Sequence, residues 1–339
     1  MQQPPTAALE LVCPAGSLRA LQLAVNAGAD AVYLGLKGAT NARNFAGLNF
    51  DGTQLADGVA YAHGHGAKVF MALNSFATAG DEQPWYRAVD AAVAAGADAL
   101  IVADTAVMAY ARDHHPTLRL HLSVQASATS HEAIDFYRRH YGIQRAVLPR
   151  VLTLSQVGHV LRHSQVEIEV FGFGSLCVMV EGRCALSSYV TAQSPNNTGV
   201  CSPPSAVRWT ETAEGVESRL NGVLIDRYAA DEPRGYPTLC KGRFEVNGRR
   251  DYALEEPTSL NSMSLLPELM RIGVRAVKIE GRQRSPAYVE QVTRVWREAI
   301  DAARAAPDRF AAKPDWTATL GHLAEGQQHT LGAYDRPWR

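Results

Sequence analysis

The chain has 339 residues, which is enough to bury the core of one large domain or two ordinary ones. Its formal net charge is −1, with Lys and Arg spread along the sequence, so bulk electrostatics give no case for binding nucleic acid or an anionic membrane surface. No stretch approaches the roughly 20 consecutive apolar residues of a membrane span. The N-terminus also lacks the pattern of a signal peptide, and we therefore expect a cytoplasmic protein.

Short apolar runs alternate with longer Ala-rich helical patterns over residues 9–173. Runs that are β-branched and apolar at consecutive positions are typical of strands buried on both faces. Seven such strands are predicted, at 9–12, 31–36, 68–74, 99–104, 118–124, 145–151 and 166–173.

Helices are predicted between these strands, among them 18–28, 86–96 and 106–115. The first two end at Gly28 and Gly96, each followed by Ala-Asp-Ala and the next strand. Glycine suits the left-handed position that ends a helix before a parallel strand. Seven successive βα units predict a parallel sheet, and so many of them favour a closed barrel over an open sheet.

An eighth strand is predicted at 274–281, followed by a helix at 285–306. The expected fold is therefore an α/β, TIM-like (β/α) barrel over residues 1–306. A cysteine-rich insertion at 174–270 would separate the seventh strand from the eighth, and residues 307–339 would form a C-terminal tail.

Short β-like pieces are also expected inside the insertion. Asn221-Gly222 and Asn247-Gly248 are dipeptides typical of two-residue hairpin turns. They predict two hairpins.

Four of the five cysteines lie in the window 177–240, beside glycine, proline or short polar residues. These four are Cys177, Cys184, Cys201 and Cys240. In the cytosol, cysteines are more often ligands than disulfides, and four thiolates suit an iron–sulfur cluster or a tetrahedral zinc ion. No pair has the C-x2–4-C spacing of a zinc knuckle, so the spacing favours iron and sulfur. Cys13, beside the first strand, is expected to pack in the core and is left out of the ligand set.

Polar residues follow the predicted C-terminal ends of the strands, where barrels carry their active sites. The candidates are Arg43, Ser123, Gln125, Arg150, Lys278, Glu280 and Arg282. The basic members would suit a small molecule that bears carboxylates, because arginine binds carboxylates with two hydrogen bonds. Each one taken alone is equally well explained as a salt-bridged surface residue.

Three segments together resemble the collagenase-like peptidase (U-type) family: 14–50 (PAGSLRAL…FAGLNF), 181–204 (EGRCALSS…GVCSPP) and 278–289 (KIEGRQRSPAYV). Within the family, the cysteine intervals and the segment TLGAYDRPWR at 330–339 are most similar to the branch that acts in oxygen-independent ubiquinone biosynthesis. The resemblance covers essentially the whole chain.

The resemblance implies a [4Fe–4S] cluster held by the same four cysteines of the window. It implies a heterodimer with a homologous, UbiV-like partner, and no nucleic-acid partner. The implied reaction is hydroxylation of the aromatic ring of a ubiquinone precursor without dioxygen, with prephenate as the oxygen donor. Prephenate is a dicarboxylate, which suits the basic mouth deduced from the strand ends.

Two alternatives stay open at this point. Sibling members of the family hydroxylate bases in transfer or ribosomal RNA, and the chain could be such an RNA-modification factor, although its neutral charge argues against it. The chain could also be a zinc peptidase-like protein with four cysteine ligands. The nearest zinc-peptidase signal, His131-Glu132, lacks the second histidine of the HExxH motif, so peptidase chemistry is not favoured.

Overall fold

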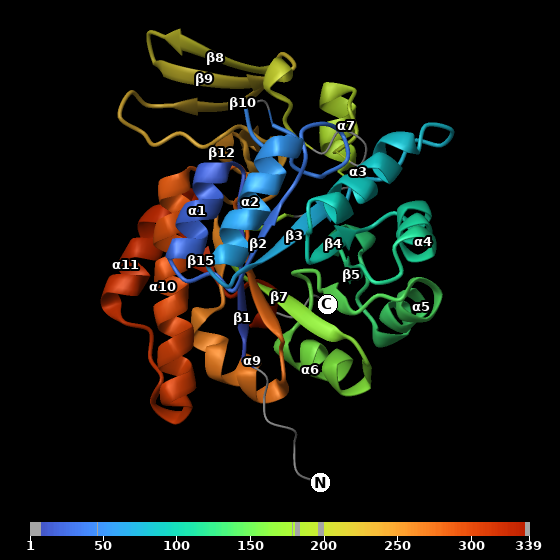
Figure 1. Ribbon diagram of the computed structural model, residues 1–339. Helices are drawn as coiled ribbons and strands as arrows, with labels where there is room; N and C mark the ends of the chain where they lie inside the picture. The colour runs from blue at the N-terminus through green and yellow to red at the C-terminus, as the bar shows by residue number, and fades with distance from the viewer. Residues whose placement is uncertain (1–7, 46, 178, 180–183, 196–199, 336–339) are drawn as a thin grey trace.

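The computed structural model describes residues 8–45, 47–177, 179, 184–195 and 200–335. Eight parallel strands form a closed barrel in the order β14-β1-β2-β3-β4-β5-β6-β7, and β7 pairs with β14 to close it (Figure 1). These strands are β1 (Glu10–Pro14), β2 (Ala31–Leu34), β3 (Lys68–Leu73), β4 (Ala99–Val102), β5 (Arg119–Leu122), β6 (Arg145–Val147), β7 (Glu167–Ser175) and β14 (Ala276–Ile279). The predicted TIM-like barrel is confirmed.

Helices surround the barrel and connect its strands (Figure 1). They are α1 (Leu18–Asn26), α2 (Gly52–Gly64), α3 (Gln83–Ala94), α4 (Thr105–His114), α5 (His131–Tyr141), α6 (Leu154–His163), α9 (Leu266–Ile272) and α10 (Pro286–Ala305). Gly28 and Gly96 have φ of 97° and 78°, which confirms that glycine ends α1 and α3 in a left-handed conformation.

The strand bounds differ from the predicted spans, and for β6 and β7 the difference has a clear physical cause. Strand β6 stops at Val147, well short of residue 151, because Pro149 has no N–H to donate to a sheet ladder. Strand β7 extends to Ser175 because its last residues pair outside the barrel with β13 (Ser259–Asn261). The far end of β7 thus leads directly into the cysteine window.

The strands are apolar at consecutive positions because side chains alternate between two buried environments. Outward residues such as Leu11 and Leu34 join the main core beneath the helices, where Trp296 of α10 is fully buried. Inward residues such as Ala31, Phe70 and Ala99 form a smaller apolar group inside the barrel.

The rest of the barrel interior is ionic. The Arg145 guanidinium on β6 lies 2.6 Å from the Glu10 carboxylate on β1 and 3.2 Å from that of Glu169 on β7. Lys278 on β14 donates to Glu169 at 2.8 Å, and Lys68 on β3 donates to Glu10 at 2.9 Å. Arg145 and Glu169 are almost fully buried, so each charge needs its partners to offset lost hydration. Side-chain bonds thus join β1, β3, β6, β7 and β14.

The chain between β7 and β14 carries its own small elements. They are α7 (Ala185–Thr191), β8 (Val207–Thr212), β9 (Gly215–Leu220), β10 (Val223–Tyr228), β11 (Arg243–Val246) and β12 (Arg249–Tyr252). Asn221-Gly222 joins β9 to β10 and Asn247-Gly248 joins β11 to β12, all four residues with positive φ, which confirms both hairpins. The β8-β9-β10 sheet stands at the upper end of the barrel in Figure 1.

The C-terminal segment is packed against the barrel. Helix α11 (Pro314–Leu323) lies on α10, where Trp316 Nε1 donates to Glu298 Oε2 at 2.9 Å. Strand β15 (His329–Thr330) pairs with β13, and the Tyr334 hydroxyl donates to the carbonyl of Phe171 on β7 at 3.3 Å. Among the described helices, none combines the length and apolar character needed to cross a membrane.

Replacing Arg145 with methionine should lower the free energy of unfolding by about 3–5 kcal/mol, because it leaves buried carboxylates without their cation. Urea denaturation of the purified protein measures the change. The control is Arg139→Met on α5, where an exposed pair with Asp135 contributes little. Equal, small effects of the two substitutions would contradict the assignment of a structural role to the interior network.

Candidate functional site

A polar mouth lies at the C-terminal end of the barrel, built largely by β14 and the residues after it. Lys278, Glu280 and Arg282 occupy alternate positions there and are only 5%, 7% and 3% exposed. Lys278 Nζ lies 4.0 Å from the centroid of the Tyr33 ring, in addition to its ion pair with Glu169. Burial lowers the pKa of Lys278, and the Glu169 carboxylate opposes that change. The lysine is therefore held between a carboxylate and an aromatic face.

The Glu280 carboxylate brings a negative charge into this mouth. Arg43 Nε lies 3.8 Å from Glu280 Oε1, and Gln283 Nε2 donates to the same oxygen at 3.1 Å. Burial alone would raise the pKa of Glu280, but the positive charges of Arg43 and Arg150 outweigh it, and the net effect lowers the pKa. Glu280 is thus ionised at neutral pH.

Arg282 is the buried cation of the mouth whose hydrogen bonding is incomplete. Its Nη1 is shielded from solvent and has no hydrogen-bond partner among the described residues. The guanidinium fits there because residue 35 is glycine: a Cβ on Gly35 would lie 2.5 Å from Nη1. Burial lowers the pKa of Arg282 to about 10, and the neighbouring charge of Arg43 contributes to the same direction. A buried guanidinium with an unused donor is suited to bind an anion such as a carboxylate.

The other two predicted mouth residues lie in the turn after β5. Ser123 Oγ accepts from the backbone N–H of Gln125, and both residues are buried. The Asn74 side chain donates to Ser123 Oγ at 3.3 Å and accepts from the backbone N–H of Ala42 at 2.9 Å. Ser123 therefore supports, through Asn74, the loop that carries Arg43.

The four cysteines of the window come from separate pieces of chain. Cys177 follows β7, Cys184 immediately precedes α7, and Cys240 lies in the short 3-10 helix Leu239–Lys241. The backbone N–H of Ser187 in α7 donates to Cys184 Sγ at 3.3 Å. Parts of the surrounding window, residues 178, 180–183 and 196–199, lie outside the described residues.

The pKa values of two of the thiols, Cys201 and Cys240, are raised, in part by the other cysteines of the window. Burial raises the pKa of Cys240 to about 12, and the charges of Cys177 and Cys201 contribute to the rise. Desolvation by the surrounding protein also raises the pKa of Cys201, although its side chain reaches the surface; Cys184 contributes to the rise and Arg43 opposes it. The thiols Cys201 and Cys240 are therefore protonated at neutral pH, and binding of a metal centre would release their protons.

The spacing of the thiols bears on which centre they could hold. Zn–S bonds of about 2.3 Å in a tetrahedron place the sulfurs about 3.8 Å apart. Within the part of the chain that the structure describes, no three of these sulfurs come within 4.8 Å of one another. Thiols are soft donors of the kind that zinc and iron–sulfur centres take as ligands.

Arg43 connects the cysteines to the mouth. Its charge acts on Cys201 on one side and on Glu280 on the other. Nearby, the Phe45 ring packs edge-on against Tyr236 at 6.1 Å, and the Tyr236 hydroxyl donates to the carbonyl of Ser202 at 2.9 Å. The loop after β2 therefore joins the cysteine neighbourhood to the barrel.

Cys13 lies elsewhere, on the outer side of β1. The Thr293 hydroxyl of α10 donates to its sulfur at 3.2 Å, and the thiol is completely buried in the main core. Burial raises its pKa to about 12. These contacts agree with a packing role and with its omission from the ligand set.

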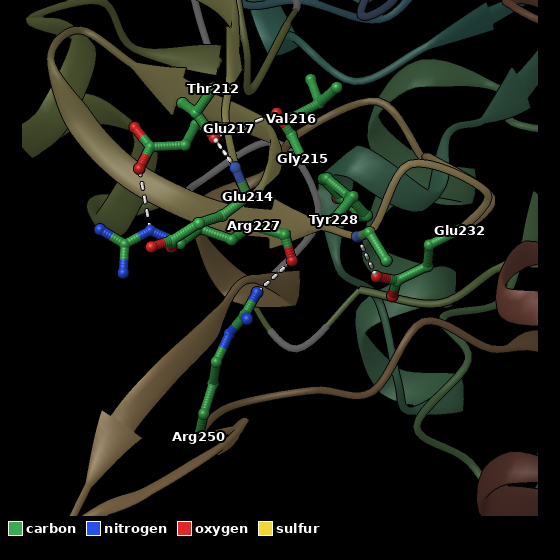
Figure 2. Close-up of a pocket in the computed structure, with 10 residues that line it drawn as sticks. Thr212, Glu214, Gly215, Val216, Glu217, Arg227, Tyr228, Glu232 and Arg250 are labelled. Carbon is green, nitrogen blue, oxygen red and sulfur yellow. Dashed lines mark hydrogen bonds and ion pairs between the residues drawn. The ribbon is translucent and has the colours of Figure 1, made fainter.

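A separate pocket lies at the turns of the β8-β9-β10 sheet (Figure 2). Several of its charged side chains are already bonded: Arg227 Nε donates to Glu217 at 2.8 Å, and Glu232 accepts from the backbone N–H of Ala229 at 3.0 Å. None of the cysteines or mouth candidates lines this pocket, so we do not assign the function to it.

Sequence reasoning missed three residues of the mouth. Tyr33 donates to the carbonyl of Ile279 at 2.8 Å, Phe171 lies 3.6 Å from the Arg150 guanidinium carbon, and Glu169 pairs with Lys278. A tyrosine or glutamate within a strand buried on both faces is a signal that could have identified Tyr33 and Glu169. Phe171 carried no such signal, because a phenylalanine is ordinary in an apolar strand.

A protein-family model and a solved structure both match this chain over most of its length. The model of peptidase family U32 matches residues 16–334. The solved structure of the U32 peptidase Mk0906 superposes with a TM-score of 0.50 at 12% identity, covering 84% of this chain and 98% of that one. At this identity the likeness concerns the fold alone.

Two curated relatives are more similar in sequence. The chain is 31% identical over 320 residues to the tRNA hydroxylation protein P1 of Bacillus subtilis (strain 168), covering 93% of this chain and 68% of that protein. It is 31% identical over 341 residues to the tRNA hydroxylation protein P of Escherichia coli (strain K12), covering 94% of this chain and 72% of that protein.

Replacing Arg282 with methionine should leave the free energy of unfolding unchanged or raise it by about 1 kcal/mol, because a buried charge with an unused donor is removed. The same variant should lose affinity for dicarboxylates, measured by calorimetric titration. The neighbouring Arg284→Met should instead cost about 1–2 kcal/mol, since Arg284 Nη2 donates to the carbonyl of Leu323 at 2.9 Å. If Arg282→Met destabilised the fold as Arg284→Met does, a purely structural role would be indicated.

Proposed function

This chain belongs to peptidase family U32, and on that basis we propose that it is a UbiU-like [4Fe–4S] subunit of an oxygen-independent hydroxylase. With a UbiV-like partner, in the cytoplasm, it would hydroxylate the aromatic ring of a ubiquinone precursor and take the oxygen from prephenate. The single observation that carries the proposal is the buried, incompletely bonded Arg282 in a mouth that Arg43 joins to four cysteines. The names of the two curated relatives support hydroxylation as the general reaction.

The residues of the cysteine neighbourhood fit an iron–sulfur cluster. Cys177, Cys184, Cys201 and Cys240 supply the four thiolates such a cluster takes, and the lack of any C-x2–4-C pair in the sequence favours it over a single zinc ion. When bound, a cluster of this kind supplies electron transfer. The Ser187 N–H donates to Cys184 Sγ, and hydrogen bonds of this kind to cluster sulfurs tune reduction potentials.

The mouth residues would bind and orient the small molecules. Arg282 and Arg43 offer guanidinium groups for the two carboxylates of prephenate; Arg43 pairs with Glu280, which in turn accepts a hydrogen bond from Gln283. The rings of Tyr33 and Phe171 are buried, and each carries a cationic side chain on its face. The Tyr334 hydroxyl donates to the Phe171 carbonyl and ties the C-terminal segment to this end of β7.

A second candidate is hydroxylation of an RNA base, because both curated relatives above are named for tRNA hydroxylation. The reaction class and the cysteine set would be the same. The formal net charge of −1 is the observation against it, since RNA binding rests on neutralising phosphates.

Anaerobic purification should yield a brown protein with broad absorbance near ~400 nm, as is usual for iron–sulfur clusters. Cys184→Ala should lose this absorbance and most of its iron, because one of the four ligands is removed. Cys13→Ala is the matched control and should retain both, since Cys13 packs against Thr293 in the core. A colourless wild-type protein that holds one zinc ion would refute the cluster.

A strain lacking the gene, grown without oxygen, should accumulate a ubiquinone precursor that lacks a ring hydroxyl. Lipid extracts and nucleoside digests are compared by mass spectrometry, with wild-type and Arg282→Met alleles restored on a plasmid. The wild-type allele should restore the quinone and Arg282→Met should fail to do so. Normal quinone together with a missing hydroxylated nucleoside would favour the RNA candidate.

A further inference from the structure

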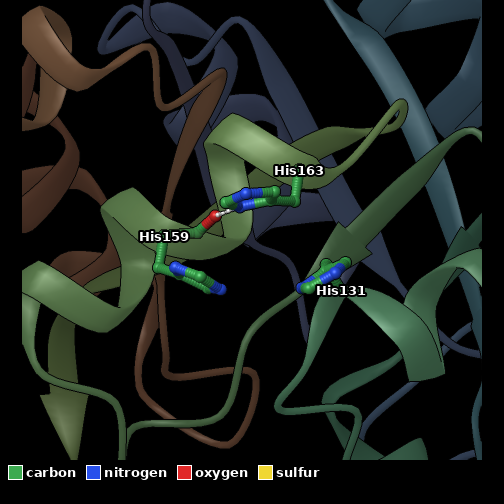
Figure 3. Close-up of side chains that lie close together, drawn as sticks. All are labelled: His131, His159 and His163. Atoms are coloured by element: carbon green, nitrogen blue, oxygen red, sulfur yellow. Dashed lines mark hydrogen bonds between the residues drawn. The ribbon is translucent and has the colours of Figure 1, made fainter.

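Three histidines gather on the outside of the barrel, away from the cysteines and the mouth. His131 is the first residue of α5, and His159 and His163 lie on α6 (Figure 3). One ring nitrogen from each lies within 4.8 Å of one from each of the others. We propose that these residues, called here the histidine triad, form a binding site for a divalent transition-metal ion such as Zn²⁺.

The geometry of α5 and α6 and their N-terminal caps position the three rings. His159 and His163 are four residues apart, so they project from the same face of α6, and their ring centroids are 4.4 Å apart. A capping box at Thr153 fixes the start of α6, and Ser130 caps α5 immediately before His131. The His131 and His163 rings stack at 4.9 Å, which brings α5 and α6 into one site.

Hydrogen bonds select the ring nitrogen that is available to a metal. His163 Nδ1 lies 2.9 Å from the carbonyl of His159, which can only accept, so Nδ1 carries the proton. His131 Nδ1 lies 3.3 Å from the Glu132 carboxylate, in an ion-pair contact. In the neutral His163 ring Nε2 therefore keeps its lone pair. A metal-binding histidine whose other nitrogen donates to a carbonyl or carboxylate is the usual arrangement in metal sites.

The distances are within reach of coordination. Zn–N bonds of about 2.05 Å in a tetrahedron put the nitrogens about 3.4 Å apart, so the present separations of up to 4.8 Å must shrink by about 1.4 Å at most. His159 and His163 are exposed, and small rotations of their side chains can supply this movement. Imidazole suits zinc, copper and nickel, and three ligands leave a position for water.

A bound ion would cross-link α5 to α6. Since it would bind the folded site more tightly than the unfolded chain, it should raise the melting temperature as its concentration rises. The site thus has a readout that does not depend on the hydroxylase activity or on the cysteines.

The test is equilibrium dialysis of the anaerobically purified protein against Zn²⁺, with metal counted by mass spectrometry. Wild type should bind one more zinc ion than His159→Ala/His163→Ala, and His131→Ala should weaken this site by about tenfold or more. His65→Ala is the matched control: its Nδ1 makes the same bond to the carbonyl four residues earlier, Tyr61, at 2.8 Å, outside the triad. It should bind zinc as wild type does.

Co²⁺ provides the second measurement, because thiolate ligands give intense charge-transfer bands that imidazole ligands lack. The ion lost in the double variant should show no such band, and zinc should raise the variant's melting temperature less than that of wild type. The proposal is overturned if the double variant binds as many zinc ions with the same affinity, or if zinc raises its melting temperature as in wild type. Circular dichroism verifies that these exposed substitutions leave the fold intact.

Discussion

The ion pair between Lys278 and Glu169 holds together the two strands on which the candidate site depends. Glu169 belongs to β7, which leads into the cysteine window, and Lys278 belongs to β14, which leads into Glu280 and Arg282. Both partners are buried, so neither charge could remain there without the other. Arg145 completes the arrangement by binding Glu169 from the opposite side. The barrel is thus closed by a charged interior, where many barrels use branched apolar layers.

The ion pairs that close the barrel determine which charged groups of the mouth can still bind a ligand. With Lys278 neutralised by Glu169 and Arg43 engaged by Glu280, Arg282 is left as the buried cation with a donor to spare. Keeping such a group costs stability, and groups that cost stability are more often retained for binding or catalysis than for folding. The close approach of its guanidinium to Gly35 shows how little room the backbone leaves for any other arrangement.

Segments distant in the sequence meet around this mouth. The loop after β2 brings Arg43 and Phe45 to the cysteine window through Cys201 and Tyr236. The C-terminal segment returns to β7 through Tyr334. Lys241, which directly follows Cys240, pairs with Glu325 of the C-terminal segment at 2.5 Å. The cysteine neighbourhood is therefore fastened to the barrel on two sides, which favours a fixed position of its thiols relative to the mouth.

The sequence by itself determined the barrel, both hairpins of the long segment before β14, and the grouping of four cysteines, because these depend on local periodicity, turn chemistry and residue type. It also named Arg43, Lys278, Glu280 and Arg282, since alternation and strand ends are visible in one dimension. Only the tertiary structure decided which of these charges is already paired and which is not, and that Ser123 acts as a support for the Arg43 loop. It agreed with the expected packing of Cys13 in the core, and it alone brought His131 beside His159 and His163. Pairing and proximity of this kind depend on contacts between strands and helices far apart in the chain, which no local pattern encodes.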